Sequence, residues 1–210
     1  MNKVLIVSRT KMQNDMVCVS GIDLENGTPI RLFNHNGYHE SKDECPYNIK
    51  DIWNIDYCKI NIRPLPHSED VRVLQRNFIE TLPASSMCDA IRDSGATIYT
   101  GNIGNVFENK IVKNETGKLY INKDTVPQNS TCFWIADHDL SRNDYNGKVR
   151  FRYKDFTNRW GYSIPFVGFE NPLEKIPAGT LLRLSLAHWW KPENSEDEER
   201  CYLQLSGWYM

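Results

Sequence analysis

The chain has 210 residues, of which 40% are hydrophobic, 25% are charged and 11% are aromatic, and its net charge is -2. This composition excludes a disordered chain, and the slightly negative charge excludes a protein that attracts polyanions with its whole surface. Nucleic-acid binding would therefore need a local basic patch. No stretch has the run of about eighteen apolar residues that a membrane-spanning helix requires, so we expect no membrane partner.

Six cysteines stand at positions 18, 45, 58, 88, 132 and 201, and no two of them have the C-x-x-C spacing of a zinc site. The start of the chain, Met1 to Arg9, has an apolar run of only four residues, which is too short for an export signal. We therefore expect free thiols, a cytoplasmic location and no cofactor.

Short β-strands dominate the first part of the sequence. Val4–Ser8 is a continuous apolar run, typical of a central strand that is buried on both faces. Val17–Ile22 and Pro29–Phe33 flank Asn26-Gly27, a pair that supplies the positive φ angles of a tight hairpin turn. Asp51–Ile62 has strand composition throughout and predicts a long, bulged strand.

The next segments predict a brief strand over Val71–Leu74 and then a short helix over residues 86–93. Ser86 and Asp89 have the spacing of a capping box, and Gly95 can end the helix. From Ala96 onward, short apolar runs recur about every ten residues between Gly, Asn and Pro, which is the spacing of all-β proteins. The last two runs flank an acidic loop at residues 193–200.

The segment Lys148–Phe166 has the alternation of a β-hairpin. Successive side chains of a strand point to opposite faces, so Val149, Phe151 and Tyr153 share one face. The opposite face is cationic and consists of Lys148, Arg150, Arg152 and Lys154. Turn formers follow at Asp155, Thr157 and Asn158, and the partner strand places Trp160, Tyr162, Ile164 and Phe166 on one face. Residues 142–160 include six Lys or Arg and two Asp, a local net charge of +4.

About a dozen short strands and one helix indicate an all-β sandwich, or one or two small barrels. The segments VLIVSRT, CVSGIDLENGTPIRLF, DIWNID, LPHSEDVRVL and LLRLSLAHWW…CYLQLSGWYM resemble those of a bacterial family described as having a dual OB-fold domain. The resemblance implies two small OB-like Greek-key barrels packed together. We assign them to residues 1–85 and 86–210, with strands that can interleave between the two. The resemblance implies no catalytic residues.

The hairpin is the main candidate for a binding site. OB barrels bind single strands by combining cations for the phosphates with aromatic rings on which bases stack. We therefore predict a non-catalytic module that binds nucleic acid, and we favour single-stranded DNA or RNA over a duplex. Its expected contacts are Lys148, Arg150, Arg152, Lys154, Arg159, Trp160 and Tyr162. The competing interpretation is a structural hairpin, in which the rings are core and the cations only face solvent.

Two other functions stay open. In the first, Trp189-Trp190 and the acidic loop dock on a partner protein, because adjacent strand residues face opposite ways and one indole is then exposed. In the second, the chain is a metal-dependent enzyme acting on nucleic acid, with His67, Glu69 and Asp70 as weak candidate ligands. His67-Ser-Glu69 matches half of a zinc-deaminase signature, but the P-C-x-x-C half is absent.

Overall fold

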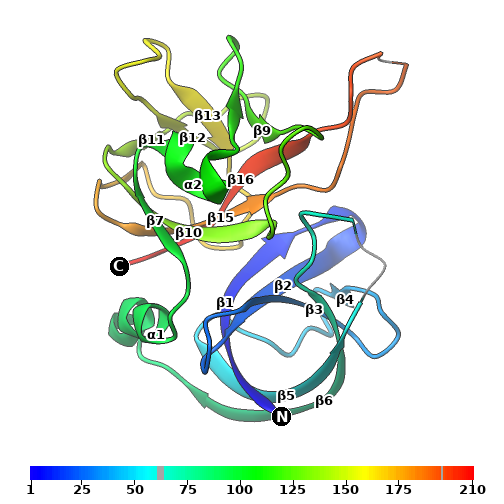
Figure 1. Cartoon of the computed structure of the whole chain (residues 1–210). Coiled ribbons are helices and arrows are strands. Elements are labelled where there is room, and N and C mark those ends of the chain that lie inside the picture. The colour runs from blue at the N-terminus through cyan, green and yellow to red at the C-terminus, as the bar shows by residue number, and fades with distance from the viewer. Residues whose placement is uncertain (61–63, 195) are drawn as a thin grey trace. The chain divides into compact units, whose positions relative to one another are not determined.

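The computed structural model describes residues 1–60, 64–194 and 196–210. Contacts divide the chain into two compact units, which Figure 1 shows with their strands labelled. The first comprises Met1–Pro64, Ser68–Thr97 and Tyr209–Met210, and the second comprises Leu65–His67 and Ile98–Trp208. The domain boundary between residues 85 and 86 and the packing of the two barrels together stay predictions.

The first unit is a closed five-stranded barrel. Its elements are β1 (Asn2–Lys11), η1 (Gln13–Asp15), β2 (Met16–Asp23), β3 (Pro29–Phe33), β4 (Glu40–Ser41), β5 (Asp51–Lys59), β6 (Asp70–Thr81), η2 (Ala84–Ser86) and α1 (Met87–Asp93). Strand pairing runs from β1 through β2, β3, β6 and β5 back to β1, and only the β3–β6 pair is parallel. Because β1 has a partner on each side, its apolar run from Val4 to Val7 is fully buried.

Most sequence expectations for this unit are confirmed. β2 and β3 form the expected hairpin, with Ile22 opposite Pro29 and Gly27 at a φ of 68°. β5 is long and has two register shifts against β6, which are the expected bulges. The predicted end of this strand at Ile62 lies outside the described residues.

The strand predicted over Val71–Leu74 is much longer than expected, because β6 continues to Thr81 in register with β5. Its later side chains are exposed and mostly polar, so no apolar period marks them in the sequence. The helix is confirmed at Met87–Asp93, but Ser86 makes no capping hydrogen bond because it belongs to the preceding 3-10 turn. Gly95 follows the helix with a φ of 79°.

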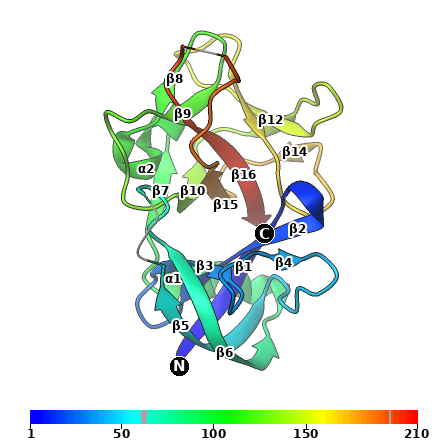
Figure 2. The same cartoon turned by 90° about the vertical axis from the view of Figure 1, so that its right-hand side faces the viewer.

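The second unit contains more and shorter strands. Its elements are β7 (Ile98–Gly101), η3 (Ile103–Asn105), α2 (Val106–Asn109), β8 (Val112–Lys113), β9 (Leu119–Ile121), β10 (Thr131–Ala136), β11 (Leu140–Arg142), β12 (Arg150–Tyr153), β13 (Tyr162–Pro165), β14 (Lys175–Ile176), β15 (Leu181–Leu186) and β16 (Cys201–Tyr209). Figure 2 shows β9 beside the start of β16, and these two strands pair at Tyr120 and Tyr202.

The second unit follows the strand order of the first, but its strands form two sheets, β7-β10-β15-β16-β9-β8 and β13-β12-β11-β14. β10 and β11 follow each other closely, and β10 pairs with β15 while β11 pairs with β12. β12 pairs with β13, β15 lies beside β16, and a parallel bridge between Phe166 and Leu205 joins the end of β13 to β16. The expectation of an all-β protein with two OB-like barrels is therefore confirmed. No helix in the described part of the chain is long and apolar enough to span a membrane.

Candidate functional site

In the β12–β13 hairpin, the apolar face is buried and the cationic face is on the exterior, as predicted. Phe151 and Tyr153 are 0% exposed, whereas the side chains of Arg152 and Lys154 belong to the other face. In the register of the hairpin, Phe151 lies opposite Ile164 and Arg152 lies opposite Ser163. The apolar face therefore enters the core of the second barrel and the cationic face is its exterior.

Arg150 is the one cation of this strand with a defined partner on the hairpin. Its Nε donates to Ser163 Oγ over 2.6 Å, and its Nη2 donates to the Ser163 carbonyl over 3.0 Å. Burial lowers the pKa of Arg150 from its ordinary value. These bonds tie β12 to β13, so Arg150 has a structural role beside any contact with a ligand.

Arg152 and Lys154 lie together over Gly161. A Cβ added to Gly161 would stand 2.7 Å from Lys154 Cγ and 3.0 Å from Arg152 Cγ. The same two cations line a shallow depression of about 220 Å³ together with Arg142, Asp139, Ser141 and Asn143. Arg142 is already paired with Asp144 and Glu174, at 2.7 and 3.0 Å. Arg152 and Lys154 are thus the cations best placed for a phosphate.

The loop between β12 and β13 presents two exposed rings. Phe156 is 97% exposed and Trp160 is 75% exposed. The guanidinium of Arg159 lies 5.7 Å from the centre of the Trp160 ring, and Phe156 meets His138 edge to face at 5.4 Å. Sequence analysis missed Phe156, because it stands in the turn, where the period of two that identified the strands is lost.

Tyr162 does not join the cationic face. It is 4% exposed and lies opposite Tyr153, on the core side of the hairpin. The Nζ of Lys113 lies 5.2 Å from the centre of its ring, and its hydroxyl is 3.4 Å from Thr157 Oγ1. Tyr162 was expected to offer a ring only if it faced the cationic side, and that condition is not met, because the alternation that buries Tyr153 buries its partner too.

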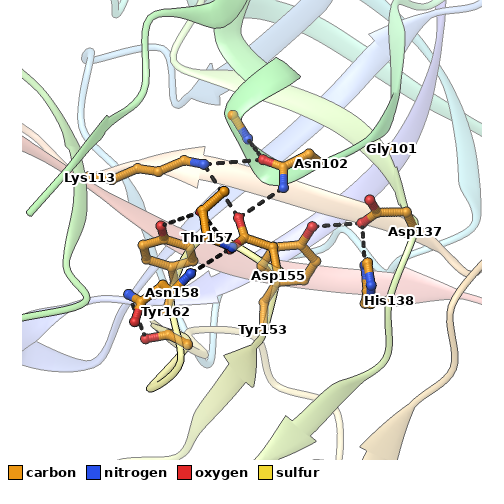
Figure 3. A network of polar contacts seen from close by, with 12 residues as sticks. Gly101, Asn102, Lys113, Asp137, His138, Tyr153, Asp155, Thr157, Asn158 and Tyr162 are labelled. Atoms are coloured by element: carbon orange, nitrogen blue, oxygen red, sulfur yellow. Dashed lines mark hydrogen bonds and ion pairs between the residues drawn. The ribbon is translucent and has the colours of Figure 1, made fainter.

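Asp155 anchors the loop, as Figure 3 shows. Its Oδ1 accepts hydrogen bonds from Thr157 Oγ1 and from the backbone N–H groups of Thr157 and Asn158, at 2.7 to 3.0 Å. Its Oδ2 accepts from Asn102 Nδ2 over 2.8 Å and lies 3.5 Å from Lys113 Nζ. The turn formers seen in the sequence are thus held to the segments around β7 and β8.

The surroundings of Asp155 stabilise its charged form. Its side chain is 2% exposed, and burial alone would raise the pKa of the carboxyl. The hydrogen bonds from Asn102 and Thr157, together with the charge of Lys113, outweigh burial and hold this pKa at about 2. A carboxylate that accepts bonds on both oxygens is a fixed structural anchor, and it is poorly suited to exchange protons with a substrate.

A second carboxylate supports the same hairpin from the other side. The Tyr153 hydroxyl donates to Asp137 Oδ1 over 2.6 Å, and His138 Nδ1 is 3.0 Å from the same oxygen. Burial first, and then the bond to Asp137, raise the pKa of the Tyr153 hydroxyl. Figure 3 shows both carboxylates on either side of Tyr153. The loop that carries Phe156 and Trp160 is therefore held at its base.

Two of the three weak metal candidates, Asp70 and His67, contact other side chains. Asp70 Oδ1 accepts from Arg31 Nε over 2.6 Å, and both side chains are buried. His67 stacks on His188 with ring centres 4.5 Å apart. Among residues 1–60, 64–194 and 196–210, no group of three or more His, Cys, Asp or Glu is placed to hold a metal ion. All six cysteines are free thiols.

The two adjacent indoles differ in exposure, as alternation predicts. Trp190 is 54% exposed, whereas Trp189 is half-buried and its Nε1 donates to the Leu65 carbonyl over 2.9 Å. In the acidic loop that follows, Glu199 pairs with Lys123 at 2.8 Å and Asp197 pairs with Arg200 at 3.8 Å. Ser195 lies outside the described residues.

Comparison with known proteins identifies a family. The family model described as "Dual OB-containing domain" matches residues 2–208. A search of curated proteins found no match.

Two solved structures are similar to the chain at low identity. One, described as "Structural mimicry for functional antagonism", is 14% identical, with a TM-score of 0.35 over 98% of this chain and 91% of that chain. The other, described as "Structure of murine DNA binding protein bound with ds DNA", is 10% identical, with a TM-score of 0.35 over 99% of this chain and 91% of that chain. At such TM-scores neither likeness carries an argument about function.

Proposed function

The chain belongs to the family of dual OB-containing domains, and we propose that it binds single-stranded nucleic acid through the β12–β13 hairpin. The observation that carries this proposal is the pair of exposed rings, Phe156 and Trp160, in the loop that directly follows the exterior cations Arg152 and Lys154. OB barrels bind oligonucleotides on the face of their second and third strands. In the second barrel those strands are β12 and β13.

The chemistry favours a single strand over a duplex. Protruding rings stack on bases only where the bases are unpaired, and each stack contributes about 1–3 kcal/mol. Duplex readout usually inserts a recognition helix into the major groove, and the longest helix of the described residues, α1, has seven residues. Lysine and arginine on the outer strand face supply the contacts to phosphates.

The proposed role is binding without catalysis, in the cytoplasm. A second candidate is docking on a partner protein through Trp190 and the acidic loop, which the 54% exposure of that indole favours. Salt separates the two functions. Phosphate contacts weaken linearly with the logarithm of salt concentration, whereas an apolar docking surface is much less sensitive.

Fluorescence anisotropy with a labelled oligothymidylate tests the proposal. The salt slope is the slope of the logarithm of the binding constant against the logarithm of salt concentration. The double variant Arg152→Ala with Lys154→Ala should reduce the magnitude of this slope by about 0.7 for each lost phosphate contact. The matched control is Lys42→Ala with Lys59→Ala, which removes the same charge from exposed positions of the first barrel. Equal binding by both double variants, or no binding by the parent at low salt, would overturn the proposal.

A further inference from the structure

The second barrel has another outer surface on which rings and cations alternate. It is formed by β9, the start of β16 and the residues next to them, and we call it the tyrosine face. Its members are Lys118, Tyr120, Trp190, Arg200 and Tyr202. The neighbouring strand residues Leu119, Ile121, Cys201 and Leu203 are buried, so alternation directs Tyr120 and Tyr202 outward.

The side chains of the tyrosine face are in mutual contact. The Tyr120 and Tyr202 rings are 5.8 Å apart, and Trp190 lies 6.1 Å from Tyr202. The Arg200 guanidinium stands 4.7 Å from the centre of the Tyr120 ring, and Lys118 Nζ is 5.9 Å from that of Tyr202. In this arrangement the rings can stack on the bases of a single-stranded nucleic acid while the cations pair with its phosphates.

Acidic side chains are paired with cations at the edge of this face. Glu199 lies 2.8 Å from Lys123, and Asp197 lies 3.8 Å from Arg200. Both pairs are solvent-exposed, with side-chain exposures between 27% and 58%. Exposed ion pairs contribute little to stability, so a polyanion can displace them at small cost. The carboxylates thus occupy places where phosphates would bind.

The tyrosine face adjoins the hairpin through a close backbone contact. Ser163 N donates to the Gly117 carbonyl over 3.1 Å, and a Cβ on Gly117 would stand 2.8 Å from the Gly161 carbonyl oxygen. Gly161 is the residue over which Arg152 and Lys154 lie, and Gly117 precedes Lys118. A single-stranded nucleic acid bound to the hairpin could therefore continue directly onto the surface of β9 and β16.

We propose that the tyrosine face is a second contact surface for the same single strand, and that Asp197 and Glu199 compete with its phosphates for Arg200 and Lys123. This inference rests on the proposed function of the hairpin. It extends the proposed binding surface from the hairpin to the tyrosine face. It also makes Asp197 and Glu199 intramolecular competitors, which weaken binding of the nucleic acid. The ligand class is a single-stranded polyanion with bases that can stack.

Two kinds of variant of the full-length chain test the inference, with a labelled oligothymidylate of about twenty nucleotides as the probe. Tyr202→Leu should weaken binding roughly fivefold or more, the loss expected for one base stack. Glu199→Gln should tighten binding more than Glu196→Gln does. The control removes the same charge from the same loop, at an exposed residue outside the two ion pairs.

Lys118→Gln gives an independent measurement if Tyr202→Leu melts at a lower temperature than the parent. It should lower the salt slope by about 0.7, the value for one lost phosphate contact. If hairpin variants weaken binding but Tyr202→Leu and Lys118→Gln do not, the second surface is refuted while the proposed function stands. Equal effects of Glu199→Gln and Glu196→Gln would refute the competitor. A parent that binds no oligonucleotide at low salt would overturn both proposals.

Discussion

The two barrels share one strand order but differ at the tip of the hairpin between their second and third strands. In the first barrel this tip is residues 24–28, a tight turn that contains no ring and no cation. A Cβ on Gly27 would collide with the backbone of Gly95 and Ala96, so the tip is covered by the segment after α1. In the second barrel the tip is residues 154–161, and it exposes Phe156 and Trp160.

The proposed site therefore lies in one copy of the fold only. The antiparallel pairing of the second and third strands is the same in both copies, and in the second copy a longer loop with its own anchor adds the rings. Asp155 is that anchor, because it ties the loop to Asn102 and Lys113. In the first barrel, Gly27 N donates to the Asp23 carbonyl, and backbone bonding completes the turn.

The largest expected effect concerns the core side of the second hairpin. Phe151→Ala should lower the free energy of unfolding by about 3–5 kcal/mol, because the ring is fully buried against Phe166 and Trp208. Arg152→Ala, one residue later and on the exterior, should change it by less than about 0.5 kcal/mol. Urea unfolding followed by fluorescence measures both. A silent Phe151→Ala beside a destabilising Arg152→Ala would reverse our assignment of inside and outside.

Removing the anchor should have a smaller, pH-dependent effect. The pKa of Asp155 is depressed from 3.8 to about 2, which corresponds to about 2 kcal/mol of stability at neutral pH. That contribution is complete above the unfolded-state pKa and disappears as the pH falls through about 2. Asp155→Asn should therefore be less stable than the parent near neutral pH, and the difference should shrink toward pH 2.

Glu115→Gln is the matched control for the anchor, since it neutralises an exposed carboxylate in the turn between β8 and β9. Denaturant unfolding at pH 7, 4 and 2 gives the comparison. A difference between Asp155→Asn and the parent that is constant across this range would contradict the assigned role of the carboxylate.

The exposed rings should affect binding without affecting the fold. Phe156→Leu or Trp160→Leu should weaken oligothymidylate binding roughly 5- to 150-fold, which is the loss of one stack of about 1–3 kcal/mol. Tyr38→Leu removes a ring that is 69% exposed on the first barrel, and it should bind as the parent does. Anisotropy and thermal melts of these variants check the contrast. Equal losses for Tyr38 and Trp160 would show that the site is not confined to the second barrel.

Much of the fold could be predicted from the sequence, because it depends on local patterns. The alternation in Arg150–Tyr153 and the Asn26-Gly27 turn are short-range signals, and both gave the correct hairpins. The length of β6 was missed, because its last residues are held by pairing with β5 rather than by burial. The bridge between Phe166 and Leu205, which joins the two sheets of the second unit, is a long-range contact that no local pattern reveals.

The candidate site was predicted less completely than the fold. The alternation of side chains along the strand predicted the exterior cations Arg152 and Lys154. The expected contact of Tyr162 required that its ring face the cations, which it does not, and Phe156 was missed. The anchor at Asp155 requires Asn102 and Lys113, which are more than forty residues away in the sequence. The Asp-x-Thr-Asn turn was visible as a turn, and only the structure shows what its carboxylate holds in place.

An NMR titration tests the central claim, that the second barrel carries the ligand face, more directly than any variant. Amide resonances of the ¹⁵N-labelled full-length chain would be followed while unlabelled oligothymidylate is added at low salt. We predict that the shifts concentrate in residues 150–165 and in the tyrosine face of the second barrel, and leave the corresponding hairpin of the first barrel, residues 16–33, unchanged. Shifts centred on residues 16–33, or no shifts at a saturating oligonucleotide concentration, would contradict the claim.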